Sequence, residues 1–111
     1  MTGSEYGINL EKHETKDIHD QHVNGNLTVI WRDWDDHHLK LPKMVYLTSV
    51  GPNEKKGPHL HTQRNSFFSC IKGKVHFIIK DKTGTYHEIE MSADKPQLLF
   101  IPKNIPAAHI N

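Results

Sequence analysis

Apolar residues come in short bursts along this chain, and turn residues separate the bursts. Each burst is shorter than a typical helix and is rich in β-branched and aromatic residues, which favours strands. No stretch after residue 25 has the periodicity of an amphipathic helix. Many short strands of this kind predict an antiparallel sandwich or barrel. The densest bursts are LTVIW at 27–31, KMVYLTSV at 43–50, SFFSCI at 66–71, KVHFIIK at 74–80 and QLLFIP at 97–102.

The N-terminal region is different, because residues 1–20 are polar and rich in charge. We expect an arm or a short edge element there. NGN at 24–26 predicts a turn, since glycine tolerates positive φ and asparagine hydrogen-bonds to nearby backbone. The other expected loops and turns are 32–42, 51–58 and 81–84, and the other candidate strands are 59–63, 86–91 and 106–111.

Length and charge limit the possibilities. A chain of 111 residues predicts one domain, 1–111. The formal net charge of +1, from 14 basic and 13 acidic side chains, indicates neither a nucleic acid nor an anionic membrane as partner. Cys70 is the single cysteine and cannot form an internal disulfide, which favours a reducing compartment. With no apolar run long enough to span a bilayer, we expect a cytoplasmic protein. Ten histidines are the one compositional oddity.

Two of these histidines stand one residue apart, in the stretch GPHLH at 57–61. On a strand, His59 and His61 would share a face, with Leu60 on the other. A pair of solvent-facing histidines is the plain alternative. A Gly-Pro loop before the pair and an apolar strand closed by Gly73 after it favour a built site.

This order resembles the first motif of the cupin superfamily, in which His59, His61 and Gly73 occupy their places and Ser66 replaces a carboxylate. The second cupin motif is similar to FIPKNIPAAHIN at 100–111, where Asn104 replaces a glycine and Ala107 a histidine. The resemblance covers roughly residues 24 to 111 and implies an all-β jelly-roll barrel. Metal cupins use three histidines and one glutamate, and this chain keeps two of the four. A metal-dependent enzyme is therefore the least favoured reading.

A narrower resemblance is to two groups of sugar-nucleotide cupins. EIEMSADKPQLLFIPKNIPAAH at 88–109 is similar to a segment of dTDP-4-dehydrorhamnose 3,5-epimerases, and GNLTVIW at 25–31 and KGPHLH at 56–61 are similar to dTDP-sugar 3,4-ketoisomerases. These cupins work without metal. The resemblance implies that His59 is the general base, that His61 lines the same pocket, and that Lys56 stands where the family has arginine.

The chemistry suits these residue types. A 4-keto group acidifies the hydrogens on the neighbouring sugar carbons, and histidine titrates near neutrality, so it can remove one of them. A second acid is commonly a tyrosine in these families, and Tyr46 is our candidate, with core or interface packing as its alternative. The epimerases carry their tyrosine and an orienting aspartate downstream of the second motif, beyond the last residue of this chain, so we do not expect full 3,5-epimerase activity.

The sequence thus predicts a metal-independent epimerase or isomerase of a nucleotide-linked 4-keto-deoxy sugar, with no cofactor. A non-catalytic sugar- or nucleotide-binding cupin is the alternative. Exposed sheet edges and the polar arm also predict a homodimer, in which one strand from residues 22–32 extends the partner's sheet. Beside the candidate catalytic residues His59 and Tyr46, the candidate substrate-binding residues are His61, Lys56, Arg64, Ser66, His76 and His109.

Overall fold

The computed structural model describes residues 6–32 and 42–111. All regular structure in these ranges is β, as predicted, and no helix in them could cross a membrane. The strands are β1 (Gly7–Asn9), β2 (Lys12–Lys16), β3 (Val23–Thr28), β4 (Lys55–His59), β5 (Ser66–Phe68), β6 (Lys74–Lys80), β7 (Tyr86–Ser92), β8 (Gln97–Ile101) and β9 (Ala107–Ile110).

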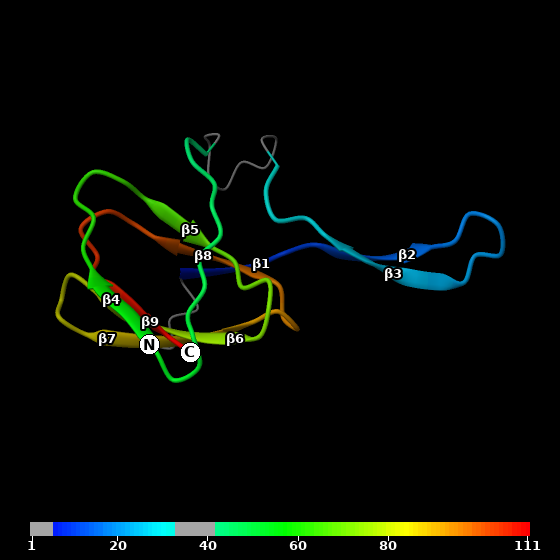
Figure 1. Ribbon diagram of the computed structural model, residues 1–111. Helices are drawn as coiled ribbons and strands as arrows, with labels where there is room; N and C mark the ends of the chain where they lie inside the picture. The colour runs from blue at the N-terminus through cyan, green and yellow to red at the C-terminus, as the bar shows by residue number, and fades with distance from the viewer. Residues whose placement is uncertain (1–5, 33–41) are drawn as a thin grey trace.

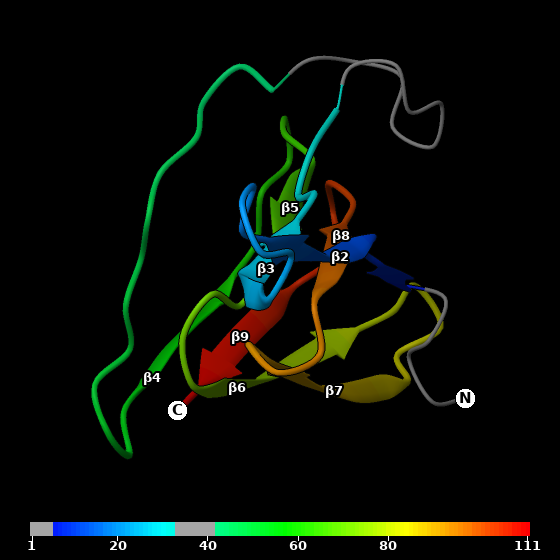
Figure 2. The same ribbon diagram turned by 90° about the vertical axis from the view of Figure 1, so that its right-hand side faces the viewer.

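The strands form two facing antiparallel sheets and a separate hairpin. One sheet has the order β1-β8-β5 and the other the order β4-β9-β6-β7. The β2–β3 hairpin pairs with neither sheet and projects away from them (Figure 1). A view turned by a right angle shows the two sheets as layers, with β9 and β6 beneath β8 (Figure 2). This all-β arrangement agrees with the expected jelly roll, although in the described residues the sheets do not close into a barrel.

The core lies between the two sheets and follows from alternation along the strands. In β6, Phe77 and Ile79 are buried and point to the core, while Lys74 and Lys80 at the strand ends are exposed. From the opposite sheet, Leu99 and Ile101 of β8 belong to the same cluster. The cluster is completed by Met91 and Ile105.

The N-terminal region differs from the prediction. NGN at 24–26 is not a turn but lies inside β3, where Gly25 pairs with Thr15. The chain reverses earlier, at Asp17, whose carboxylate accepts backbone N–H groups of His19 at 2.8 Å and Asp20 at 3.2 Å. An aspartate that bonds the backbone just ahead of it forms a turn as readily as Asn-Gly does. Residues 7–16 therefore contribute two strands where we expected an arm or a short edge element.

The strand expected at 43–50 is absent as a paired strand. The segment makes no ladder with any described strand, and Met44, Val45 and Leu47 are 61%, 83% and 81% exposed. Its apolar residues satisfy the pattern of a strand, but pairing requires a neighbouring edge that pattern alone does not supply. The prediction of a strand at 43–50 was therefore wrong for the single chain.

The turn between β6 and β7 is the tight turn predicted at DKTG, and Asp81 organises it. The carboxylate of Asp81 accepts the backbone N–H groups of Thr83 and Thr85 at 2.9 and 3.0 Å. It also accepts the Thr83 hydroxyl at 2.6 Å and Nε2–H of the buried His87 at 2.7 Å. These hydrogen bonds, those of Thr83 and His87 first, hold the pKa of Asp81 far below its usual range.

Because the folded-state pKa of Asp81 is depressed, its stabilising effect is present above the ordinary aspartate pKa and is lost as the pH falls through the folded value. We expect Asp81→Asn to lower the urea midpoint near neutral pH. We also expect it to weaken the loss of stability that the unmutated protein shows below about pH 4. Asp94→Asn, at an exposed turn position, is the control. Equal pH dependence in Asp81→Asn and wild type would contradict the role of this carboxylate.

Candidate active site

The site begins with an irregularity in β4. Lys56 lies opposite His109 of β9, and His59 lies opposite Ala107, so three steps along β4 match two along β9. In a regular strand, residues three apart point to opposite faces. The extra residue makes Lys56 and His59 share one face. It is the inner face, because His109 and Ala107 lie opposite Phe77 and Ile79 of the core.

Gly57 makes this bulge possible. Its φ is 97°, and a Cβ added there would lie 2.9 Å from the carbonyl oxygen of Ala107 and 3.1 Å from the Cα of Ala108. Any other residue would combine an unfavourable φ with a clash against backbone. The sequence predicted a loop over 51–58, and the structure instead places β4 over its last residues.

His59 and His61 lie face to face although β4 ends at His59. Their ring centroids are 6.3 Å apart and the ring planes differ by 11°. His61 is held from the other side of the molecule, since Asn104 N–H donates to its carbonyl oxygen at 2.7 Å. Asn104 has a φ of 69°, which explains an asparagine in the glycine place of the second motif. A strand at 59–63 was expected to put the two rings on one face. The rings do lie together, but His61 is in a loop and is positioned by its hydrogen bond with Asn104.

Arg64 contacts the ring of His61. Its guanidinium lies 3.1 Å from His61 Nε2, and because a guanidinium can only donate, that nitrogen accepts. Both residues border a surface hollow lined by residues 60–64.

His109 is partly buried on the inner face. Its ring lies 5.2 Å from the ring of Phe77 and 6.1 Å from that of Phe68. Its Nε2 is buried and has no hydrogen-bond partner among the described residues. Burial, followed by the nearby charges of Lys56 and His59, lowers the pKa of His109. His109 is therefore neutral near pH 7.

Lys56 provides the positive charge of this group. Its exposed side chain donates from Nζ to the hydroxyl of Thr48 at 2.9 Å, so the ammonium is held beside the inner face instead of moving freely in solvent. The inner-face cluster thus consists of Lys56, His59 and His109, with His61 and Arg64 next to it. The sequence did not point to Thr48 or to the two phenylalanines around His109, because neither follows from spacing.

The structure does not bring His76 into this cluster. His76 lies on the outer face of its sheet, where its ring nitrogens contact Glu88 at 3.2 Å and Glu90 at 3.5 Å. On the neighbouring strand β7, His87 points inward instead. His87 is buried at the far edge of the sheet from β4 and pairs with Asp81.

Two other predicted residues stand apart from the cluster. Tyr46 belongs to the unpaired segment, is 56% exposed, and makes no hydrogen bond or ring contact within the described residues. Ser66 begins β5 and lies opposite Ile101, on the inner face of the other sheet. Trp31 packs edge-on against Phe67, so core or interface packing describes it, and Trp34 lies outside the described residues.

The donor set does not fit a cupin metal ion. His59 and His61 supply two imidazoles, and Ser66 and Ala107 stand where the other ligands of a metal cupin would be. A mixed imidazole and carboxylate shell is what iron or manganese prefers. Within the described residues, ligand atoms of three such side chains gather at Asp17, Asp20 and His22, at the end of the β2–β3 hairpin. None of the residues of the inner-face cluster belongs to that group.

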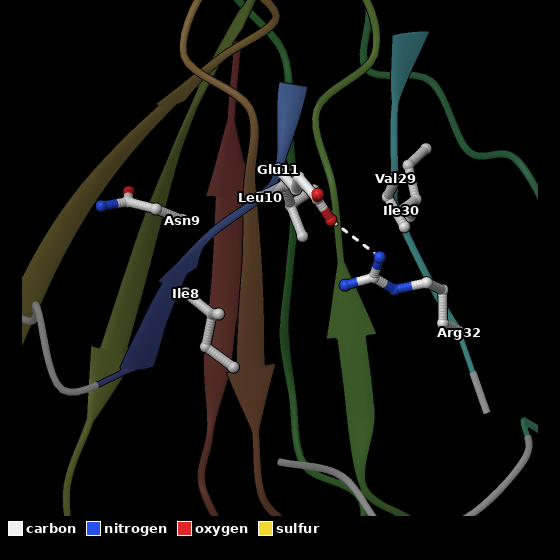
Figure 3. A pocket seen from close by; sticks show the side chains of 7 residues that line it. All are labelled: Ile8, Asn9, Leu10, Glu11, Val29, Ile30 and Arg32. Carbon is white, nitrogen blue, oxygen red and sulfur yellow. Dashed lines mark ion pairs between the residues drawn. The ribbon is translucent and has the colours of Figure 1, made fainter. Parts of the chain in front are cut away.

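A second hollow lies away from these histidines, between β1 and the residues that follow β3 (Figure 3). Arg32 and Glu11 form an ion pair of 2.7 Å across it. Apolar side chains of Ile8, Leu10, Val29 and Ile30 line it beside this ion pair. With its two charges paired to one another, this hollow has the character of packing between the hairpin and the sheet.

Comparison with known families places the chain. The family model described as FdtA, WxcM-like, C-terminal matches residues 8–111. The chain belongs to this family. It is a cupin-type domain of dTDP-sugar isomerases, which confirms the resemblance to the cupins and to the dTDP-sugar ketoisomerases. No curated protein matches the chain.

The bulge yields a direct test. Gly73 also has a positive φ, of 70°, but an added Cβ there meets nothing within 4 Å. We expect Gly73→Ala to reduce the free energy of unfolding by about 1–2 kcal/mol, the cost of the left-handed conformation. Gly57→Ala should cost at least about 1 kcal/mol more, because the backbone of β9 must also move. Urea unfolding measures both, and equal losses would show that the close approach to β9 is unimportant.

Proposed function

We propose that the protein is a metal-independent isomerase of a dTDP-linked 4-keto-deoxy sugar, with His59 as the base. The observation that carries the proposal is the bulge, which places His59 beside Lys56 on the inner face. Family membership supports the substrate class. The proposal also covers two further details, which are the identity of the sugar and a ketoisomerase rather than an epimerase reaction.

The proposed reaction starts at a carbon next to the ketone. His59 is exposed at the end of β4 and is not engaged by any carboxylate among the described residues, so its imidazole is available to accept a proton. Histidine is the side chain that most often serves as a general base in enzymes. Removal of the proton gives an enediolate, and return of the proton to the neighbouring carbon moves the ketone.

Binding of the substrate uses the neighbouring charges. A dTDP-sugar carries a diphosphate, and Lys56 and Arg64 supply two cations at the edge of the cluster. His61 contacts Arg64 through Nε2, which leaves its other ring nitrogen, Nδ1, for a hydrogen bond to a sugar oxygen. In this proposal Ser66 offers its hydroxyl to the substrate from the opposite sheet, and Tyr46 is the candidate for the second acid. His76 is not included, because it faces outward.

The base is tested by replacement with asparagine, which keeps some hydrogen bonding but cannot accept the proton. We expect His59→Asn to slow deuterium incorporation from solvent into dTDP-4-keto-6-deoxyglucose by about 10²–10⁴-fold, the usual contribution of a general base. Binding of dTDP should change little. The exchange is followed by NMR. His76→Asn is the matched control and should keep the wild-type rate.

The outcomes separate the alternatives. dTDP binding without any exchange in the wild type would favour the non-catalytic binding protein. Equal exchange in wild type and His59→Asn would leave an isomerase but place its base elsewhere. Loss of exchange in His76→Asn would contradict the placement of that residue outside the site.

We also propose that the protein is a homodimer in which a strand from residues 22–32 extends the partner's sheet, in the cytoplasm. The β2–β3 hairpin supports this, because both of its edges are unpaired within the described residues and Val23 and Leu27 are exposed. The unpaired segment at 43–50 offers a second apolar edge. Exposed edges of this kind are usually covered.

Sedimentation at micromolar concentration should therefore show a dimer. Leu27→Lys places a charge on the exposed apolar side of β3 and should shift the equilibrium toward monomer. Lys74→Glu, at the exposed start of β6 and away from the hairpin, also changes the charge of an exposed site and serves as the control. A wild-type protein that sediments as a monomer would contradict the proposal.

A further inference from the structure

His109 has a geometry that the proposed reaction has not yet used. It shares the inner face with Lys56, which lies directly opposite it on β4. His59 lies on the same face, opposite Ala107, which is two residues from His109 along β9. The rings of Phe77 of β6 and Phe68 of β5 are tilted against its ring, with centroids 5.2 and 6.1 Å away. Strand β9 lies between β6 and β4, and β4 carries Lys56 and His59.

The two ring nitrogens of His109 are in different surroundings. Nε2 is buried without a hydrogen-bond partner in the described part of the chain, whereas Nδ1 is not among the buried atoms and makes no hydrogen bond there either. A proton on both nitrogens would leave a charge against two phenyl rings, which is costly. Burial and the neighbouring Lys56 and His59 accordingly lower the pKa of His109. The favoured form is neutral, with the proton on the open Nδ1.

We propose that His109 is a second proton carrier of the active site, which moves a proton between the two substrate oxygens while His59 moves the carbon-bound proton. This inference rests on the proposed isomerase function. His61 is less suited to the task, because the guanidinium of Arg64 already occupies its Nε2. A neutral imidazole is an effective partner for a carbonyl oxygen, since it can give a proton and take one back at the same nitrogen.

The step balances without any further reactant. His59 takes the proton from the carbon that bears the hydroxyl, the C–H electron pair forms the C=C bond, and the carbonyl pair moves to its oxygen. Nδ1 of His109 gives its proton to that oxygen and receives the proton of the neighbouring hydroxyl. The second oxygen then becomes the carbonyl, and protonated His59 delivers its proton to the former carbonyl carbon. The ketone has moved by one carbon, and both histidines are restored.

The test follows two events in one sample of dTDP-4-keto-6-deoxyglucose in deuterated water. One is deuterium entry at the carbon next to the ketone, and the other is conversion to the 3-keto sugar. Two variants are used: His109→Asn keeps a donor near the place of Nδ1 but cannot exchange its proton, and His109→Phe keeps the packing with Phe68 and Phe77. The control is His76→Asn on the outer face of the sheet.

We expect conversion to fall by about 10²–10³-fold in both His109 variants, within the usual range for one proton carrier. Deuterium entry should fall less, so the ratio of exchange to conversion rises at least about tenfold, because an enediolate can form and return but not finish. A purely structural role would lower both rates equally. An unchanged ratio in the variants, with an active wild type, overturns this inference alone. Absence of both exchange and conversion in the wild type overturns the proposed function and this inference with it.

A second measurement uses the unmutated protein, so it does not depend on the folding of a variant. In protein labelled with ¹⁵N-histidine, His109 should be neutral at about pH 6.5, the ordinary histidine pKa, with its proton on Nδ1. Its Nδ1 signal should shift when the sugar nucleotide is added. A His109 that is charged at this pH, or that does not respond to the sugar nucleotide, overturns the proposal.

Discussion

At Gly57 the backbone of β4 comes so close to β9 that an added Cβ would lie 2.9 Å from a carbonyl oxygen. This approach permits the extra residue in β4, and the extra residue turns Lys56 and His59 to the same face. In a regular strand one of them would point to solvent on the outer side. His59, Lys56 and His109 therefore form one cluster because of a backbone contact rather than a side-chain interaction.

The same sheet gives three histidines three different environments. His76 points outward and contacts two glutamates. His87 points inward and is buried against Asp81, where its Nε2–H completes a turn. Among the described residues, His109 points inward with two aromatic rings near it and no carboxylate beside it, so it stays neutral near pH 7. Strand alternation and the nearest charge decide each case, while the residue type is constant.

The small core and the unpaired apolar edges both bear on the stability of the single chain. The described residues bury a single cluster of apolar side chains between the sheets, while Val45 and Leu47 remain over four-fifths exposed. A short chain has much surface relative to its core, and uncovered apolar edges of this size are unusual in a stable monomer. A second copy that covers them would add to the stability of the fold and would leave the inner-face cluster where β4 and β9 place it.

The sequence by itself determined the all-β class, the strands β6, β7 and β8 to within a residue or two, and the tight turn at Asp81. It also identified His59 and His61 as candidate site residues. These features depend on local alternation and turn chemistry, which act over a few residues. The tertiary structure decided which histidines reach the site. His76 was predicted there and lies outside, since its face is set by its pairing with β7 and β9. Three other contacts join residues that are distant in the chain, and no local pattern encodes them. They are the approach of Gly57 to β9, the hydrogen bond from Asn104 to His61, and the packing of two phenylalanines against His109.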